Sequence, residues 1–585
     1  MCGIIAIAGK KVQSTKDDGV EKMLSCLSLR GPDEKAFTRT SEIILGQTRL
    51  SIVDLALGHQ PMKDNTHPLS IVFNGEIYGY KDLRIELEKQ GHVFSTNSDT
   101  EVILKAYVQY GKNCVDHIDG MFAFALWDDE SKELFIARDR FGKKPLYYHI
   151  DDSSILIASE IKAIQALGVK TEIDRAAIDN YLALMYIPPW KSVYKNIYVL
   201  PPAHRGFYKD GIVKIDRYWK LEDKPVPPVS YEEAKSKVKK LLDEAVKKRM
   251  VADVEIGSLL SGGVDSTLVT AYAQKYTGKP LKTFSVGYEG YINELPFALT
   301  ASRKIGTDHH TLQASSDLIL ELEKVMSYFD EPHADTSNFP QHMVSELAGK
   351  HVKVALSGDG ADELFMGYGW YWKYWNTKKI LRLKNFLFSN PFKEHMKSIQ
   401  IFSEKERSKL WKNPGAVNGD IIDKNVREMR GNGIKKINLF DLTTYLPGQL
   451  LSKVDRTSMM HSLEIRSPFL DYKLAEYAYN LPLEHKTDKK GGKIILKDIL
   501  GEIMPEEFVH RRKQGFGAPV TAWLRTEKMR EYVSEKLGEE ALSRNFLSGE
   551  AIEELLKSFY GKGDDSLSLR IWTLLCLELW FRSRG

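Results

Sequence analysis

The segment Ser261-Gly-Gly-Val-Asp-Ser266 constrains this chain most, because it joins an apolar run to a helical pattern. The run that ends at Leu260 predicts a buried strand, and the spacing of apolar residues from Thr267 to Tyr276 predicts a helix. A strand, a glycine loop and a helix together point backbone N–H groups at one place, the helix N-terminus, which binds anions. The segment therefore predicts an α/β domain with a phosphate-binding loop.

The loop differs from the ordinary P-loop, since it has no Gly-Lys-[Ser/Thr] ending that brings a lysine to the phosphates. Asp265 stands there instead, and a carboxylate suits a phosphate site when Mg²⁺ lies between them. The alternative is that Asp265 only favours the positive end of a helix. The full segment resembles the pyrophosphate loop of ATP pyrophosphatases, which cut ATP to AMP and pyrophosphate.

Length and composition indicate a globular protein of several domains. The 585 residues predict two to four domains, and the net charge of +4 is too small to indicate nucleic acid or an anionic membrane as a partner. No apolar run approaches the roughly 18 residues of a membrane span, and the first residues lack a basic leader. The four cysteines are too widely spaced for a disulfide framework or a zinc site. We expect a cytoplasmic protein.

Cys2 is the first candidate catalytic residue. Removal of the initiator methionine before a small residue would leave Cys2 with both a thiol and a free α-amine, whose pKa of about 8 suits a general base. The alternative is a small buried apolar residue, which most free cysteines are. Cys2 alone favours that alternative.

Three later segments favour a catalytic role. Arg49 ends a predicted strand and can grip a carboxylate with its guanidinium. Asn74 and Gly75 offer the adjacent donors that an oxyanion hole needs, and Asp99 can hold an ammonium group. Taken separately, each has an alternative: Arg49 as a surface charge, Asn74-Gly75 as a hairpin turn and Asp99 as a helix N-cap. Together with Cys2, they predict a site for an amino acid whose amide is broken.

These segments also carry a family resemblance. The matching motifs are Met-Cys-Gly-Ile at the start, Arg30-Gly-Pro-Asp33, Gly120-Met-Phe-Ala-Phe124, Arg138-Asp-Arg-Phe-Gly142 and the three segments above. They resemble the N-terminal-nucleophile glutaminase domain of class II amidotransferases. Combined with the pyrophosphate loop, the whole chain resembles the glutamine-hydrolysing asparagine synthetases from end to end.

The resemblance implies roles in the first domain. Cys2 attacks the side-chain amide of glutamine, and Asn74 with the Gly75 N–H holds the oxyanion. Leu29 and Gly79 depart from the histidine and asparagine that the family often has, and neither lies next to the nucleophile in sequence. The positions that match glutamine contacts are Arg49, Leu50, Ser51, Ile52, Val53, Asn74, Gly75, Glu76 and Asp99.

A second acidic glycine loop, Ser357-Gly-Asp-Gly-Ala-Asp-Glu363, follows a predicted strand over 352–356. Open α/β sheets place ligands at the carboxyl ends of their strands, so its carboxylates suit Mg²⁺ beside ATP. The alternative is a polar turn with solvated acids. The resemblance implies that Asp265 and Asp362 bind Mg²⁺. It implies ATP contacts at Leu260, Ser261, Gly262, Gly263, Asp265, Ser266, Val286, Ser357 and Gly358.

Two further residues receive roles from the resemblance. Asp359, where many relatives have glutamate, is tied to formation of the acyl-adenylate and to taking a proton from ammonia. Lys513, in a basic loop rich in glycine, is assigned to the departing pyrophosphate, whose charge it would offset. The segments 452–456 and 462–471 match a signature near the pocket for the acid substrate.

We therefore expect two domains. Residues 1–222 form an α+β N-terminal-nucleophile glutaminase, an αββα sandwich, and residues 231–585 form an α/β ATP-pyrophosphatase synthetase with a Rossmann-like parallel sheet. The proline-containing stretch 222–230 is the expected linker.

The expected function is ATP-dependent amidation of the aspartate β-carboxylate with ammonia from glutamine, through β-aspartyl-AMP. Products are asparagine, glutamate, AMP and pyrophosphate, with ATP and Mg²⁺ as cofactors and a homodimer as the assembly hypothesis. One alternative keeps the mechanism and changes the acceptor to another carboxylate, such as a uronic acid of a cell-surface polysaccharide. A second is a non-catalytic sensor of glutamine or nucleotide, which the intact Cys2, Asp265, Asp362 and Lys513 disfavour.

Overall fold

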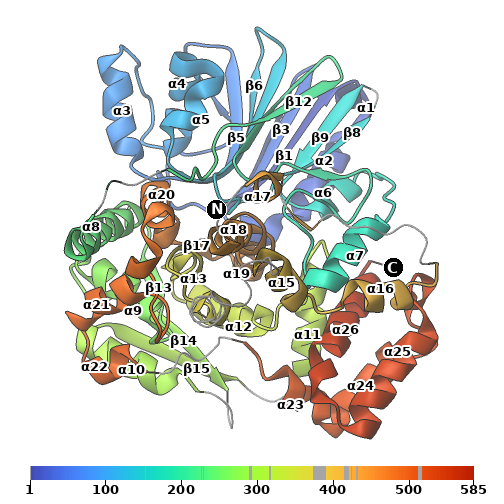
Figure 1. Cartoon of the computed structure of the whole chain (residues 1–585). Helices are drawn as coiled ribbons and strands as arrows, with labels where there is room; N and C mark the ends of the chain where they lie inside the picture. The colour runs from blue at the N-terminus through green and yellow to red at the C-terminus, as the bar shows by residue number, and fades with distance from the viewer. Residues whose placement is uncertain are drawn as a thin grey trace.

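The computed structural model describes residues 2–151, 153–224, 227, 229–288, 293–314, 318–372, 391–413, 421–422, 424–429, 433–511 and 517–584. Figure 1 shows a sandwich of strands formed by the N-terminal part, above a parallel sheet and a group of C-terminal helices. Over the described ranges, no helix is both long enough and apolar enough to cross a membrane.

Two antiparallel sheets form the first domain. The first has the strand order β10-β8-β9-β1-β3-β2 and the second β12-β11-β7-β6-β5-β4. The strands are β1 (Cys2–Gly9), β2 (Glu34–Arg39), β3 (Ile43–Arg49), β4 (Met62–Lys63), β5 (Leu69–Ile77), β6 (Gly120–Asp128), β7 (Glu133–Arg138), β8 (Tyr147–Asp151), β9 (Ser154–Ala158), β10 (Tyr198–Val199), β11 (His204–Lys209) and β12 (Ile212–Arg217).

The alternation of side chains along these strands builds a layered core. On β1, Ile4 and Ala6 pack against the facing sheet, while Ile5 and Ile7 pack against helices on the outside. The outer helices on the β1 side are α1 (Lys11–Ser14), α2 (Asp17–Ser25), α6 (Ile161–Gln165) and α7 (Arg175–Leu184), and on the β5 side α3 (Tyr80–Lys89), α4 (Asp99–Tyr110) and α5 (Cys114–His117). This is the predicted αββα sandwich.

A parallel sheet, ordered β15-β14-β13-β16-β17, organises the second domain. Both faces are covered, since Leu356 of β16 packs with α8 and α9 and its neighbour Ala355 packs with α12 and α19. The predicted Rossmann-like sheet is confirmed. Its elements are α8 (Tyr231–Arg249), β13 (Ile256–Leu259), α9 (Val264–Gln274), β14 (Lys282–Tyr288), α10 (Leu295–Ile305), β15 (Asp308–Ala314), α11 (Leu318–Tyr328), α12 (Asn338–Gly349), β16 (Val354–Leu356), α13 (Ala361–Leu364), α19 (Ser452–Met459) and β17 (Glu464–Arg466).

Helices complete the second domain and join it to the first. The segment η3 (Asp441–Leu451) is π-helical, contains Pro447 and continues directly into α19. Tyr181 of α7 donates a hydrogen bond to the Thr573 carbonyl of the C-terminal helix at 2.7 Å, so the two domains share a core. The remaining helices used below are α15 (Pro391–Ser398), α16 (Glu404–Leu410), α17 (Lys424–Glu428), α18 (Gly433–Phe440), α20 (Tyr472–Asn480), α21 (Ile494–Gly501), α22 (Glu506–Val509), α23 (Val520–Arg525), α24 (Glu527–Lys536), α25 (Gly549–Leu556) and α26 (Ser568–Arg582).

Candidate active site

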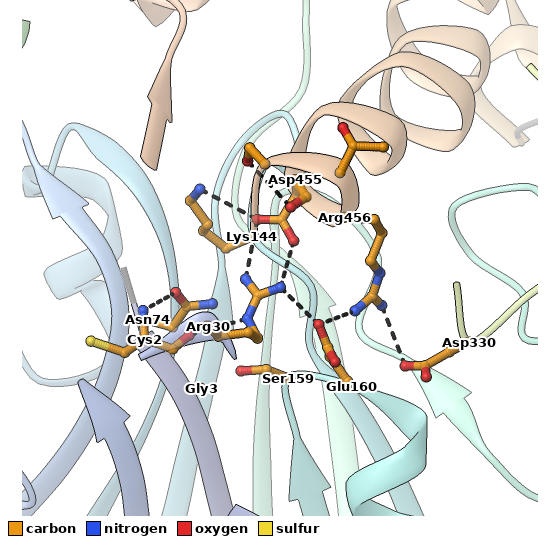
Figure 2. A network of polar contacts seen from close by, with 12 residues as sticks. Cys2, Gly3, Arg30, Asn74, Lys144, Ser159, Glu160, Asp330, Asp455 and Arg456 are labelled. Carbon is orange, nitrogen blue, oxygen red and sulfur yellow. Dashed lines mark hydrogen bonds and ion pairs between the residues drawn. The ribbon is translucent and has the colours of Figure 1, made fainter. Parts of the chain in front are cut away.

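Cys2 opens β1 and lies against the facing sheet. Its backbone N–H donates to Oδ1 of Asn74 on β5 at 3.0 Å, and the antiparallel register sets Arg49 of β3 opposite it. Burial raises the pKa of the Cys2 thiol, whereas the Leu50 backbone and the Arg49 charge oppose that rise. Figure 2 shows the thiol at the edge of a network of polar contacts. The fold thus brings the predicted nucleophile and Asn74 together.

The Asn74 side chain has a donor to spare. Its Nδ2 is buried and has no hydrogen-bond partner among the residues that the structure describes, while its Oδ1 holds Cys2 in place. Gly75 cannot carry a side chain, because a Cβ there would lie 2.1 Å from the Met121 carbonyl oxygen. The two residues lie inside β5, so the hairpin-turn alternative is wrong. A buried donor without a partner beside a thiol fits an oxyanion hole.

Arg49 shapes the loop that carries the other expected glutamine contacts. Its guanidinium donates to the Asp54 carbonyl at 2.8 Å and forms a 3.4 Å ion pair with Glu34. The loop is fixed from the other side as well, because the Ser51 N–H donates to Asp33 at 2.8 Å. Leu50 and Ile52 are buried, and Val53 is half-buried. In this structure, Arg49 holds the loop in place by donating hydrogen bonds to the backbone carbonyls of the loop.

Glu76 of β5 and Asp99 of α4 form a buried pair of acidic residues. Asp99, the first residue of α4, accepts the Ile77 N–H at 3.0 Å, and burial raises its pKa to about 6. Glu76 is paired with Arg466 of β17 at 3.0 Å, although burial raises the pKa of Glu76, and the Asp99 charge adds to that rise. The N-cap alternative for Asp99 is wrong, because Ser98 caps this helix.

A buried ionic network joins the Cys2 region to the second domain (Figure 2). Arg30 donates from Nε to the Cys2 carbonyl at 3.3 Å and from Nη1 to Asp455 of α19 at 2.8 Å. Glu160 is 3.0 Å from Arg30 and 2.7 Å from Arg456. Burial opposes ionisation of Asp455, but Arg30 and Lys144 outweigh it and hold its pKa below its usual range. The signature segment 452–456 is therefore connected through Arg30 to the backbone carbonyl of Cys2.

The pyrophosphate loop has the predicted strand–loop–helix form between β13 and α9. Gly262 has a φ of +72°, and a Cβ there would lie 2.5 Å from the backbone of Phe297. Inside the loop, the hydroxyls of Ser261 and Ser266 are 3.1 Å apart, and the Gly263 N–H donates to Ser261 at 3.3 Å. These interactions shape a tight loop at the end of a parallel strand.

The two acidic loops meet at Lys493. Its ammonium lies 2.5 Å from Asp265 and 2.7 Å from Asp362, and these carboxylates raise its pKa against the opposing effect of burial. A Cβ on Gly358 would lie 2.8 Å from the Asp265 Cβ, so the loops pack directly on each other. The fold thus places both predicted magnesium ligands within reach of one cation.

The other predicted ATP contacts lie near the carboxyl ends of β13, β14 and β16. Leu260 and Val286 are buried at the ends of β13 and β14, and Ser285 donates to the Leu260 carbonyl. Ser357 donates to Asp359 at 2.6 Å, and burial raises the pKa of Asp359. Lys513 lies outside the described residues.

The two departures from the family pattern have simple local settings. Gly79 is the N-cap of α3 with a φ of +67°, a conformation that asparagine also tolerates. The Leu29 side chain is 48% exposed, and its carbonyl accepts the Ser462 hydroxyl at 2.7 Å. Neither position touches the Cys2–Asn74 pair through a hydrogen bond that the described residues make.

Lys493 and Arg466 contact the predicted site residues Asp265 and Glu76. The sequence patterns did not single out Lys493, and they include Arg466 only as part of the signature segment 462–471. Lys493 belongs to the glycine-containing basic segment Lys489-Lys-Gly-Gly-Lys493, and its own φ of +60° is a signal that only coordinates reveal. Arg466 meets Glu76 although 390 positions separate them. No local pattern encodes such a pairing.

Comparisons with known proteins match both halves of the chain. A family model described as a glutamine amidotransferase domain matches residues 1–219, and one described as asparagine synthase matches residues 237–582.

Three curated relatives match nearly the whole chain. Asparagine synthetase [glutamine-hydrolyzing] 1 of Bacillus subtilis is 32% identical over 99% of this chain and 96% of its own length. Asparagine synthetase [glutamine-hydrolyzing] 3 of the same organism is 34% identical over 90% of each chain. The mouse asparagine synthetase [glutamine-hydrolyzing] is 28% identical over 93% of this chain and 89% of its own.

Proposed function

Because this chain belongs to the family of glutamine-hydrolysing asparagine synthetases, we propose residue roles for each half of that reaction. The enzyme amidates aspartate to asparagine with ATP and with ammonia from glutamine. The relatives do not favour the alternative of a uronic acid as the acceptor. The observation that carries the assignment of residues is the 3.0 Å contact of Cys2 with Asn74, whose Nδ2 is left to donate.

In the first half-reaction, removal of Met1 makes the Cys2 nitrogen a free α-amine that can take the thiol proton. The thiolate attacks the side-chain carbonyl carbon of glutamine, and Asn74 Nδ2 with the Gly75 N–H stabilises the oxyanion. Collapse of the intermediate breaks the C–N bond while the α-ammonium gives its proton to the leaving nitrogen, which departs as ammonia. Water then hydrolyses the glutamyl thioester to glutamate and restores the thiol. Bound glutamine is held through its ammonium by Asp99 and through its carboxylate by Arg49.

In the second half-reaction, the aspartate β-carboxylate attacks the α-phosphorus of ATP and pyrophosphate leaves. Ser261 to Ser266 offers N–H groups and hydroxyls to the phosphates, while Leu260 and Val286 flank the base. Ser357 and Gly358 complete the nucleotide contacts. We assign Asp359 to taking a proton from ammonia, because burial raises its pKa and so makes its carboxylate a stronger base. We assign Lys513 to the leaving pyrophosphate, whose negative charge it would offset.

Mg²⁺ fits the residues that meet at Lys493. Asp265 and Asp362 supply the hard oxygen donors that this cation prefers, and one ammonium already lies between them. When bound, Mg²⁺ would neutralise charge on the phosphates. Lys493 holds the carboxylates in register and offsets their mutual repulsion.

We also propose the domain boundaries 1–222 and 231–585, a cytoplasmic location and a homodimeric assembly. The family matches over residues 1–219 and 237–582 support the boundaries.

Product analysis of wild type and Cys2→Ala tests this function. With aspartate, glutamine and MgATP, wild type yields glutamate, asparagine, AMP and pyrophosphate. Cys2→Ala loses glutamate production and keeps asparagine synthesis from ammonium salts. If Cys2→Ala retains glutaminase activity, the role of Cys2 is wrong. If pyrophosphate release responds to a uronic acid and not to aspartate, the acceptor is wrong.

A further inference from the structure

A cavity of about 630 Å³ lies between the two domains, outside both candidate sites. The first domain contributes the loop after β7 and the segments that flank β11 and β12, and the second contributes α17, α18 and η3. Neither the loop 261–266 nor the loop 357–363 lines it. Its volume falls within the range of about 300–1,000 Å³ that small-molecule sites occupy.

Basic side chains from both domains enter the lining, and two of them are paired with acids beside it. Lys220 lies 3.9 Å from Glu222, and Lys424 lies 3.8 Å from Glu428. Five basic residues line the cavity, and its lining residues include no aspartate or glutamate. They are Arg140, Arg217, Lys220, Lys424 and Arg427. Cations from both domains around one space favour an anion that bridges them.

Arg140 is the buried member of this set. It is 8% exposed, and its guanidinium donates from Nη1 to the Ile118 carbonyl at 2.8 Å and from Nη2 to the Val115 carbonyl at 3.4 Å. Its Nε is buried and has no hydrogen-bond partner within the described part of the chain. The guanidinium also lies 4.4 Å from the centroid of the Tyr472 ring, so Arg140 contributes a positive charge held in place to this wall of the cavity.

Aromatic rings form another part of the wall. Trp219 is fixed by a 2.8 Å hydrogen bond from its Nε1 to Glu476, and it packs edge-on against Phe141 with ring centroids 5.3 Å apart. Trp190 also lines the cavity. Rings fixed beside arginines are the surroundings that bind a planar heterocycle carrying phosphate.

We propose that this cavity is an effector site for a nucleotide, with the phosphate among the arginines and the base against the tryptophans. The proposal is independent of the residue roles assigned above.

The walls connect such a ligand to the buried ionic network of Arg30, Lys144 and Asp455 between the domains. Arg140 and Phe141 lie in the loop that continues to Lys144, which contacts Asp455 at 3.5 Å. Leu442 and Pro447 lie in η3, which runs into α19 and so to Asp455 itself. π-Helical segments occur frequently at functional sites. Occupation of the cavity therefore acts on both sides of the Arg30–Asp455 contact.

Calorimetric titration of the full chain tests the binding. Saturating α,β-methylene-ATP with Mg²⁺ first fills the ATP loop, and AMP, GMP and UMP are then titrated separately, with inorganic phosphate as the comparison. We expect one further equivalent of at least one nucleotide to bind, at least tenfold more tightly than phosphate. The double variant Arg217→Gln with Lys220→Gln weakens it tenfold or more, and Trp190→Leu weakens the nucleotide without changing phosphate binding.

Lys214→Gln is the matched control, since it removes an exposed cation from β12 that does not line the cavity. The same nucleotide should change the ratio of asparagine to glutamate formed by wild type at least twofold and leave that ratio unchanged in the double variant. Absence of a second nucleotide equivalent, equal binding of phosphate, unchanged affinity in the folded variants or an unchanged product ratio would each overturn the proposal.

Discussion

The Asn74 side chain accepts a hydrogen bond from the Cys2 nitrogen through Oδ1, and its Nδ2 has no partner among the described residues, so it is free for the proposed oxyanion contact. A hydrogen-bond donor that is buried without a partner is costly, so its retention suits a group that is satisfied only when substrate charge develops. The sequence predicted the donor type but not its environment, because burial depends on the sheet that faces β5.

Asn74→Ala removes the proposed oxyanion donor. We expect kcat for glutamine hydrolysis to fall about 10²–10³-fold, the usual cost of losing one such donor. Ammonia-dependent synthesis of asparagine should keep its wild-type rate, which provides the internal control. A loss of both activities in equal measure would instead indicate a folding defect.

Asp99→Asn tests the titration of the buried carboxyl group at the start of α4. Because burial raises the pKa of Asp99 to about 6, the folded state binds its proton more tightly than the unfolded state, and stability falls as pH rises from about 4 to 6. The asparagine variant avoids this cost and should gain up to about 3 kcal/mol above pH 6, with no gain below pH 4.

Thermal melts of wild type and Asp99→Asn between pH 4 and pH 7.5 measure that gain. KM for glutamine should rise at the same time, since the proposed ammonium contact is lost. An equal melting difference at every pH would contradict the titration of Asp99, and an unchanged KM would contradict its contact with substrate.

Among the elements, α19 does the most to join the halves of the molecule. It sets Lys453 3.3 Å from Asp335, pairs Asp455 with Arg30 and pairs Arg456 with Glu160, so nearby positions of one helix contact different parts of the chain. The sequence identified 452–456 as part of a family signature, because the motif consists of neighbouring residues. It could not predict the partners, which lie hundreds of positions away.

Asp455→Asn weakens the contact of α19 with Arg30. We expect glutamine-dependent synthesis of asparagine to fall more than either glutaminase or ammonia-dependent synthesis, because Arg30 also holds the Cys2 carbonyl. The variant should lose on the order of 2 kcal/mol of stability, as expected for a hydrogen bond to a charged group.

Asp179→Asn is a matched control, because Asp179 forms a buried 3.0 Å pair with Arg407 outside this network. It should lower stability without changing the ratio of glutamine-dependent to ammonia-dependent synthesis. If both variants shift that ratio alike, α19 has no special part in joining the reactions.

Lys493 lies just before α21 and holds the two acidic loops together. Lys493→Met leaves Asp265 and Asp362 to repel each other, so the melting temperature without Mg²⁺ should fall. Added Mg²⁺ should then raise it by about 2–4 °C more than in wild type, because binding is linked to stability. Lys490→Met, an exposed lysine of the same loop, provides the control. Equal Mg²⁺ effects in all three proteins would argue against a shared cation site.

The molecule as a whole places two sites against one interface. The sandwich could be expected from the family resemblance of the motifs in the first domain, and an α/β domain could be predicted from a strand–loop–helix motif of neighbouring residues. Interfacial pairs such as Glu76 with Arg466 could not, since burial of each charge becomes tolerable only when the other domain supplies its partner. The proposed roles of the two sites therefore rest on motifs, and the contacts between the domains come from the structure.

The central claim is that nitrogen released at Cys2 is delivered within this chain to the carboxylate activated at the Asp265 loop. Glutamine labelled with ¹⁵N in its side-chain amide, supplied with an excess of unlabelled ammonium, tests it by mass spectrometry of asparagine. We expect a ¹⁵N fraction in asparagine several times that of the bulk ammonia, with one AMP per asparagine, and unlabelled asparagine from Cys2→Ala. A ¹⁵N fraction in wild-type asparagine equal to that of the bulk ammonia would contradict the account.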